Sequence, residues 1–212
     1  SSCGGCWAFA ATGLVEAMAI IQHGAPTSLD LAEQFPLSCD VETHQIYGVA
    51  SDGCCGGYVT VFDFLKNEGT LSETQLPFSG DFDGDHIRPG CTTGAPPWAT
   101  VPCPEPVPST TAYRVADWAL IRNDGQLPTV LQLKSRLQSG PVWLGYQVYS
   151  DFISYWVSAP ADSVYRHSSG TYQGGHAVLL VGYDDAVGAW IVRNSWGASA
   201  GPRGDGTWLM DF

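Results

Sequence analysis

The sequence predicts an α+β protein with a helical first half and a strand-rich second half. Apolar residues recur at helical spacing in three segments before residue 75, whereas alternating or continuous apolar runs dominate after residue 140. Between them, residues 75–109 are rich in Pro, Gly and Asp, which hold neither a helix nor a central strand for long. We therefore expect a helical lobe over residues 1–108, a strand-rich lobe over residues 109–212 and a ligand-binding cleft between them.

Three helices are predicted in the first lobe. The longest runs over residues 6–23, and shorter ones are expected over residues 29–39 and 58–69, where Gly69 acts as a C-terminal stop. The second lobe opens with one more helix, at residues 129–140. It continues with strands expected at residues 141–148, 176–184, 189–196 and 207–212.

The charge balance excludes some partners. Asp and Glu number 21 against 9 Lys and Arg, which gives a formal net charge of −12. Such a chain is repelled by duplex nucleic acid and by anionic lipid. The longest apolar stretch, residues 7–21, is interrupted by Gly13 and Glu16 and is too short to span a bilayer. We expect neither a nucleic-acid partner nor a membrane span.

The chain has seven cysteines, an odd number that predicts disulfides plus one remaining thiol. Three disulfides in a chain of this size indicate an oxidising compartment, so we expect a secreted protein or one in a vacuole or lysosome. The cysteines are Cys3, Cys6, Cys39, Cys54, Cys55, Cys91 and Cys103.

Cys6 stands where a nucleophilic thiol is expected. It begins the first predicted helix, where unsatisfied backbone N–H groups and the helix dipole favour the thiolate form. Gly4 and Gly5 allow another backbone to approach the sulfur, and Trp7 can pack behind it.

A thiol nucleophile needs a base, and His176 and Asn194 supply a base and its orienting group. His176 opens one predicted strand and Asn194 ends the next, and residues 184–188 can join the two strands as a hairpin. The amide can then bond one imidazole nitrogen while the other faces Cys6, and Trp196 can shield that bond from water.

Three segments, residues 3–9, 174–184 and 193–197, resemble in this order the papain/cathepsin family of cysteine peptidases. Residues 31–40 and 53–59 are similar to further family segments, and residues 149–155, followed by residues 169–172, resemble the strand and turn that precede the catalytic histidine. The resemblance thus covers nearly the whole chain. It implies a papain-like two-lobed fold with a helical N-terminal lobe, an antiparallel β-sheet or barrel as the C-terminal lobe, and an active-site cleft between them.

The resemblance also implies the chemistry. It makes Cys6 the nucleophile of a thioester acyl-enzyme, His176 the general base and then acid, and Asn194 the orienter. The expected activity is peptide-bond hydrolysis by an endopeptidase without metal or cofactor. The expected partners are polypeptide substrates and a propeptide or protein inhibitor, and the chain is expected to be a monomer. Residues expected to bind substrate are Gly4, Gly5, Gly56, Gly57, Tyr58, Gly145, Gly175 and Trp196.

For the disulfides, the resemblance pairs Cys3 with Cys54. Cys39 then pairs with Cys91 or Cys103, and Cys55 takes the other of those two. This arrangement leaves Cys6 as the thiol that the odd count requires.

The sequence departs from the family pattern in three places. Gly5 replaces the usual Ser or Ala, and Ala200 stands near the place of the family's second tryptophan. The glutamine of the oxyanion hole falls one position before Ser1 and is absent from this chain, which leaves the backbone N–H of Cys6 as the oxyanion donor. We therefore expect an upstream segment in the complete molecule.

Several other interpretations were weighed. Cys3 and Cys6 also fit a C-x-x-C redox pair, and a zinc site would use Cys3, Cys6, Cys54 and Cys55. The three Asp of residues 81–85 do not match an EF-hand, so an acidic surface turn is expected there. No role is predicted for His23, His44, His86 and His167. The main alternative is a catalytically impaired papain-like homologue that acts as a binding module.

Overall fold

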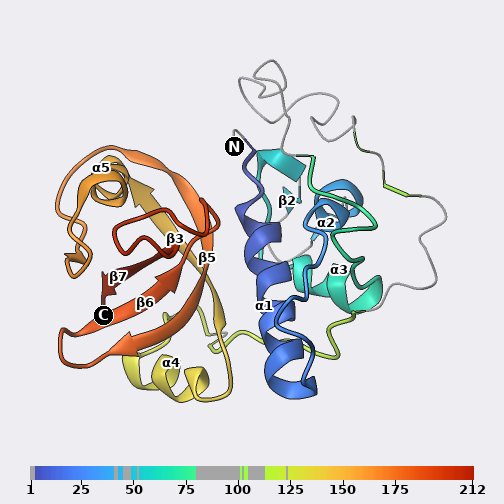
Figure 1. Cartoon of the computed structure of the whole chain (residues 1–212), viewed down its shortest axis with the longest axis horizontal. Helices are drawn as coiled ribbons and strands as arrows, with labels where there is room; N and C mark the ends of the chain where they lie inside the picture. Colours follow the sequence, from blue (N-terminus) through green and yellow to red (C-terminus); the bar gives the residue numbers. More distant parts are fainter. Residues whose placement is uncertain are drawn as a thin grey trace. The chain divides into compact units, whose positions relative to one another are not determined.

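The computed structural model describes residues 3–40, 43–44, 49–51, 53–79, 101, 103–104, 113–122 and 124–212, of which 43–44, 49–50 and 55 are described by their backbone alone. The chain forms two compact units, Ser1–Trp118 and Ala119–Phe212 (Figure 1). The boundary predicted after residue 108 lies outside the described residues. No helix in the described part is both long and apolar enough to cross a bilayer.

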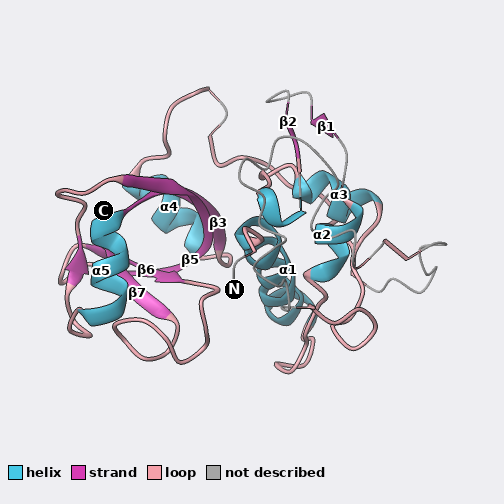
Figure 2. Cartoon of the chain, turned by 90° about the horizontal axis from the view of Figure 1, so that it is seen from above, coloured by secondary structure: helices cyan, strands magenta, loops and turns pink. Residues whose placement is uncertain are grey.

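The first unit consists mainly of helices. Figure 2 shows α2 and α3 beside the long helix α1. The elements are α1 (Cys6–His23), α2 (Gln34–Cys39), β1 (Thr43–His44), β2 (Val49–Ala50), a 3₁₀ turn at Gly53–Cys55, and α3 (Val61–Asn67). The side chains that pack between the helices are almost fully buried: Trp7, Ala8, Ala11, Leu31, Phe35, Leu37, Val61, Leu65 and Leu71.

Helix α1 has the predicted bounds. It ends because Gly24 adopts the left-handed conformation, with φ of 65°, and donates its backbone N–H to the carbonyls of Ala19 and Ile20. Cys6 is the first residue of the helix, directly after Gly5. The thiol expected to act as nucleophile is therefore placed at a helix N-terminus.

Helix α2 is shorter than predicted, because the residues before it are held in an extended conformation. The Ala32 N–H donates to the Leu71 carbonyl at 2.9 Å, and the Leu31 N–H donates to the Glu16 carboxylate at 2.7 Å. These long-range bonds override the helical pattern of residues 29–33. Helix α3 also covers less than the predicted residues 58–69, and Gly69 follows it with φ of 80°.

The second unit is a five-stranded sheet in the order β3-β5-β6-β7-β4. Strands β3, β5, β6 and β7 are antiparallel, as predicted, and the two-residue strand β4 adds to β7 in parallel. The strands are β3 (Val142–Tyr149), β4 (Val164–Tyr165), β5 (Tyr172–Asp184), β6 (Ala189–Arg193) and β7 (Thr207–Asp211).

Strand β5 begins earlier than predicted. His176 was expected to open it, but the strand starts at Tyr172, because Gly174 and Gly175 also pair with β3. His176 therefore lies inside the strand, opposite Tyr146. The residues directly before and after His176 are also paired with β3, so the position of its backbone is well defined.

Residues 149–155, followed by 169–172, were expected to form a strand and turn. Most of the first segment is helical instead, because α5 (Ser150–Ser158) follows β3 directly. Phe152 and Trp156 are one helical turn apart, so both side chains enter the core from one face of α5. At the opposite end of the sheet lies α4 (Val130–Leu137), which was predicted and is capped by Thr129 (Figure 1).

The core of the second unit is rich in aromatic residues, and both helices pack against it. Val130, Leu133 and Leu137 cover it from α4. Its buried members are Val148, Phe152, Trp156, Tyr165, Val178, Leu180, Trp190, Val192 and Trp208.

Glu33, which precedes α2, is a largely buried acid in the first unit. Burial disfavours its charged form and raises its pKa to about 8. The negative charges of Glu73, Glu16 and Asp30 act in the same direction. In the unfolded chain a glutamate titrates near about 4.3, so the folded protein holds a proton here over a wide pH range that the unfolded chain has already released.

We predict that Glu33→Gln stabilises the protein at neutral and higher pH. The folded state binds the extra proton between about pH 4.3 and 8, so the free energy of unfolding of the wild type falls as pH rises through this window. Glutamine does not titrate, so the variant does not lose this part of its free energy of unfolding. Urea unfolding should show equal stability near pH 4 and an advantage for the variant that grows to at most about 5 kcal/mol near pH 8, at about 1.36 kcal/mol per unit of pKa difference. The exposed Glu68→Gln is the control, and parallel pH profiles for wild type and Glu33→Gln would contradict the prediction.

Candidate active site

The turn that carries Cys6 is tied to the residues around Cys54. A disulfide joins Cys3 to Cys54, and the Gly4 N–H donates to the Cys54 carbonyl at 2.7 Å. A Cβ atom added to Gly5 would lie 3.1 Å from the Cys3 sulfur. Cys6 itself is partly buried and outside the disulfides. At the first helical position, its backbone N–H has no acceptor within the helix.

The Trp7 side chain packs against this turn and stabilises it. Its ring is 1% exposed, and its Nε1–H donates to the Gly53 carbonyl at 3.0 Å. A Cβ atom at Gly57 would lie 2.3 Å from the same ring, so only glycine fits there. Residue 56 has a φ of 126°, a backbone conformation that residues other than glycine rarely adopt, so Gly56 suits this position. Tyr58 beside them is 38% exposed.

The cysteine pairing removes two of the alternatives weighed above. Since Cys3 is bonded to Cys54, it forms no redox pair with Cys6, and two of the four proposed zinc thiolates are consumed. Cys39 pairs with Cys103 rather than with Cys91. A partnership of Cys55 with Cys91 stays a prediction, because Cys91 and the Cys55 side chain lie outside the described residues. Within the described part, no group of three or more His, Cys, Asp or Glu is arranged to hold a metal ion.

In the second unit, His176 and Asn194 lie side by side. The β5–β6 hairpin places them together, with His176 Nε2 at 2.8 Å from Asn194 Oδ1. The Ser195 N–H also donates to Oδ1, at 2.9 Å, which marks this atom as the carbonyl oxygen. An amide oxygen only accepts, so Nε2 carries the proton and Nδ1 of the neutral ring is the basic nitrogen.

The imidazole is shielded from solvent. His176 and Asn194 are each 7% exposed, and the Trp196 ring stacks on His176 with centroids 4.8 Å apart. Burial lowers the pKa of His176, and the hydrogen bond to Asn194 opposes this effect without cancelling it. The neutral form of His176, which can accept a proton, is therefore favoured.

The other residues expected to bind substrate in this unit lie on the neighbouring strands. Gly145 pairs with Ala177, and Gly175 pairs with Gln147, across β3 and β5. Both glycines are exposed, and a Cβ atom at Gly175 would meet nothing within 4 Å. Exposed glycine backbone is thus present directly before His176 on β5 and, on β3, opposite Ala177, which follows it.

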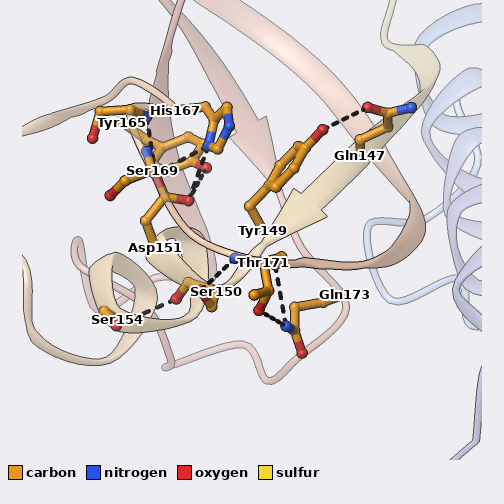
Figure 3. A network of polar contacts seen from close by, with 11 residues as sticks. Gln147, Tyr149, Ser150, Asp151, Ser154, Tyr165, His167, Ser169, Thr171 and Gln173 are labelled. Atoms are coloured by element: carbon orange, nitrogen blue, oxygen red, sulfur yellow. Dashed lines mark hydrogen bonds and ion pairs between the residues drawn. The ribbon is translucent and has the colours of Figure 1, made fainter.

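A polar network holds the chain just before β5 (Figure 3). Asp151, in the first turn of α5, accepts hydrogen bonds from the Tyr165 hydroxyl at 2.9 Å and the Ser168 N–H at 3.0 Å. Ser169 N–H and His167 Nδ1 lie 3.3 and 3.1 Å from its Oδ2. His167, for which the sequence predicted no role, is thus part of this network.

A second pair of bonds continues the network toward β5. The Ser150 N–H donates to the Thr171 carbonyl at 2.9 Å, and the Thr171 N–H donates to Ser150 Oγ at 3.1 Å. Together these contacts anchor residues 165–171 on α5 and so define where the strand carrying His176 begins. Sequence reasoning missed this network, because its members are polar side chains and backbone groups spread over residues 150–171 without a periodic pattern.

We predict that Asp151→Asn destabilises the protein in a pH-dependent way. Burial raises the pKa of Asp151, but the bonds donated by Ser168, Tyr165, Ser169 and His167 outweigh it and hold the pKa well below its usual range. A depressed carboxyl pKa contributes stability above the unfolded value of about 3.9, and this contribution is lost as pH falls below that value.

The measurement is urea unfolding of wild type and Asp151→Asn at pH 7 and at pH 3. The variant should be weaker by roughly 1–3 kcal/mol at pH 7, and the difference should shrink at pH 3. Asp162→Asn, which changes an exposed aspartate in the loop between α5 and β4, is the control. A difference that is independent of pH would contradict the role of the charge.

We also predict that Gly57→Ala displaces Trp7 and costs roughly 1–3 kcal/mol of stability, because the added methyl group overlaps the ring. Gly175→Ala is the matched control, since its added Cβ atom meets open space. Thermal unfolding of both variants checks this, and equal melting temperatures would show that the close approach is not restrictive.

Comparison with known proteins agrees with this architecture. The family model described as "Papain family cysteine protease" matches residues 1–208. "Cathepsin B-like CP3" of Giardia intestinalis is 30% identical over 206 residues, which cover 95% of this chain and 60% of that protein. The chain spans less than two thirds of the length of the curated relatives it matches.

Solved structures show the same fold. Xylellain, a cysteine protease from Xylella fastidiosa, superposes with a TM-score of 0.71 at 23% identity, covering 99% of this chain and 73% of that one. A proCathepsin B from Trypanosoma congolense gives a TM-score of 0.69 at 23% identity, covering 99% and 64%. With the match of the family model over nearly the whole chain, these findings show that the chain belongs to the papain family of cysteine proteases.

Proposed function

We propose that this chain is the catalytic part of a cysteine peptidase that hydrolyses peptide bonds through Cys6, His176 and Asn194. The observation that carries the proposal is the buried bond between His176 Nε2 and Asn194 Oδ1, 2.8 Å long, beneath Trp196. This bond leaves Nδ1 as the basic nitrogen of the imidazole. A neutral imidazole can activate a nucleophile whose proton is acidic enough to be transferred to it. The thiol at the N-terminus of α1 has the chemistry of that nucleophile.

The reaction follows from these groups. His176 Nδ1 takes the proton of the Cys6 thiol, and the thiolate attacks the scissile carbonyl carbon. The Cys6 backbone N–H stabilises the resulting oxyanion. The carbon–nitrogen bond then breaks, His176 protonates the leaving amine, and a thioester remains. His176 next removes a proton from water, whose attack releases the acid and restores the thiol.

The proposed substrate is an extended polypeptide. Gly56 and Gly57 would offer backbone groups to it, as in strand addition, and the exposed Tyr58 would contact its side chains. Gly4, Gly5, Gly145, Gly175 and Trp196 complete the proposed substrate-binding set. We propose endopeptidase action, because an extended peptide that binds through its backbone need not present a terminus.

The proposed setting is an oxidising compartment, outside the cell or in a vacuole or lysosome. Two disulfides in the described part support this. The Trypanosoma congolense structure is described as a proCathepsin B, which supports a propeptide as a partner of this chain too.

A binding module on the same fold is the second candidate. One fold can serve catalysis in one protein and binding in another. The experiment must therefore distinguish a peptidase from a folded chain that does not react.

We predict that Cys6→Ala abolishes hydrolysis of a mixed fluorogenic peptide library, with a loss on the order of 10⁴-fold or more in kcat/KM, while the fold is retained. His176→Ala should abolish turnover as well, and should shift the pH midpoint of thiol alkylation toward the ordinary value of roughly 8.5. His23→Ala, which removes an exposed histidine at the end of α1, is the control and should retain activity. The assays use the reduced 212-residue chain and a version extended upstream by the family's glutamine segment.

The outcomes separate the candidates. Cleavage that depends on Cys6 supports the peptidase, and cleavage by the extended version alone shows that the glutamine is required. Equal hydrolysis by wild type and Cys6→Ala would overturn the assignment. A folded chain that is silent in both forms, and whose alkylation is unaffected by His176→Ala, would favour the binding module.

A further inference from the structure

Trp196 shields the His176–Asn194 bond, yet it does not belong to a strand or helix. It lies in the loop between β6 and β7 and is itself 40% exposed. A half-exposed ring in a loop keeps its place only if neighbouring groups hold it. The position of Trp196 over the imidazole therefore needs a physical explanation.

The support comes from α5. The Trp156 and Trp196 rings form an edge-to-face pair with centroids 5.5 Å apart and an angle of 86°. Phe152, one turn earlier on the same helix, lies 5.9 Å from Trp196. Trp156 is 8% exposed and also contacts Trp208, at 5.8 Å, so it is anchored in the core.

Trp156 also fills the inner side of the β6–β7 loop. A Cβ atom at Gly201 would lie 2.6 Å from its ring, so the indole occupies the place that a side chain there would take. Gly201 has a φ of 81°, which suits glycine as well. Ala200, next to it, is small and packs against the same core. The loop thus has no bulky side chain at either residue, and the ring from α5 supplies the bulk.

We propose that Trp156 is a positioning residue for the active site: it holds Trp196 against His176 and so keeps water away from the His176–Asn194 hydrogen bond. Its effect on turnover rests on the proposed function, but its effect on His176 does not. When Trp156 is shortened, Trp196 loses the edge-to-face contact, and the imidazole becomes hydrated.

The consequence is measurable at His176 itself. Burial lowers the pKa of this imidazole, so hydration raises it toward the ordinary histidine value. The groups facing the ring within this unit are Asn194, Trp196 and Tyr146 of β3, whose ring centroid lies 5.7 Å away. In a Cys6→Ala background the proposed thiol partner is absent, so the shift reports shielding alone.

The test is an NMR titration of His176 in the 212-residue Cys6→Ala chain, with the resonance assigned by its loss in His176→Gln. Trp156→Leu should raise the His176 pKa, and Trp156→Phe, which keeps an aromatic ring, should raise it less. Trp190→Leu is the matched control. Trp190 is a buried ring of the same core whose partners are Tyr183 and Phe212, so shortening it should leave the titration unchanged.

Two outcomes would overturn the proposal: an unchanged His176 titration in folded Trp156→Leu, or an equal shift in Trp190→Leu. If Trp156→Leu fails to fold, the Trp156→Phe variant decides the question. An unchanged His176 titration in that variant, together with unchanged fluorescence quenching of Trp196, would contradict the proposal that Trp156 supports Trp196. In the chain with Cys6 intact, Trp156→Leu should lower kcat with little change in KM. Should the chain with Trp156 and Cys6 intact prove inactive in both its 212-residue and its extended form, the proposed function fails, while the titration still decides the role of Trp156.

Discussion

The buried hydrogen bond between His176 and Asn194 is the interaction on which the arrangement of the second unit depends. Two polar side chains that are each 7% exposed are stable only when they bond to each other, since a buried polar group without a partner is costly. The β5–β6 hairpin brings the two residues together, and Trp196 covers them. The same bond selects the imidazole tautomer, so the shielding and the basicity of Nδ1 have one physical origin.

The first unit meets a different constraint, which is to hold a thiol at a helix N-terminus without enclosing it. The disulfide from Cys3 to Cys54 and the Gly4 N–H bond fasten the turn, and the Trp7 ring fills the space against Gly57. The bulky Trp7 ring next to Cys6 is itself buried, 1% exposed, whereas Cys6 is only partly buried. A rigid turn with glycines around it is therefore combined with an accessible backbone, which is what a peptide substrate would need.

Local pattern predicted the elements whose side chains face one continuous core. The predicted bounds of helix α1 were correct at both ends, because the helical spacing of its apolar residues and the stop at Gly24 indicate the same segment. Helix α2 began later than predicted, because bonds from Leu31 and Ala32 to distant residues compete with the helix. Helix α5 was not predicted, because the family resemblance indicated a strand and turn in this segment. Phe152 and Trp156 nevertheless have the four-residue spacing of a buried helix face. The parallel strand β4 has only two residues, too few for a periodic pattern.

The sequence by itself determined the family and singled out the side chains proposed to do the chemistry, because a thiol, an imidazole and an amide are properties of single side chains within local motifs. Only the tertiary structure decided that Cys39 pairs with Cys103, that Asp151 anchors the approach to β5, and that Trp156 supports Trp196. These contacts join residues far apart in the sequence or in different elements. Which side chains meet is decided by how whole elements pack, and no short segment contains that information.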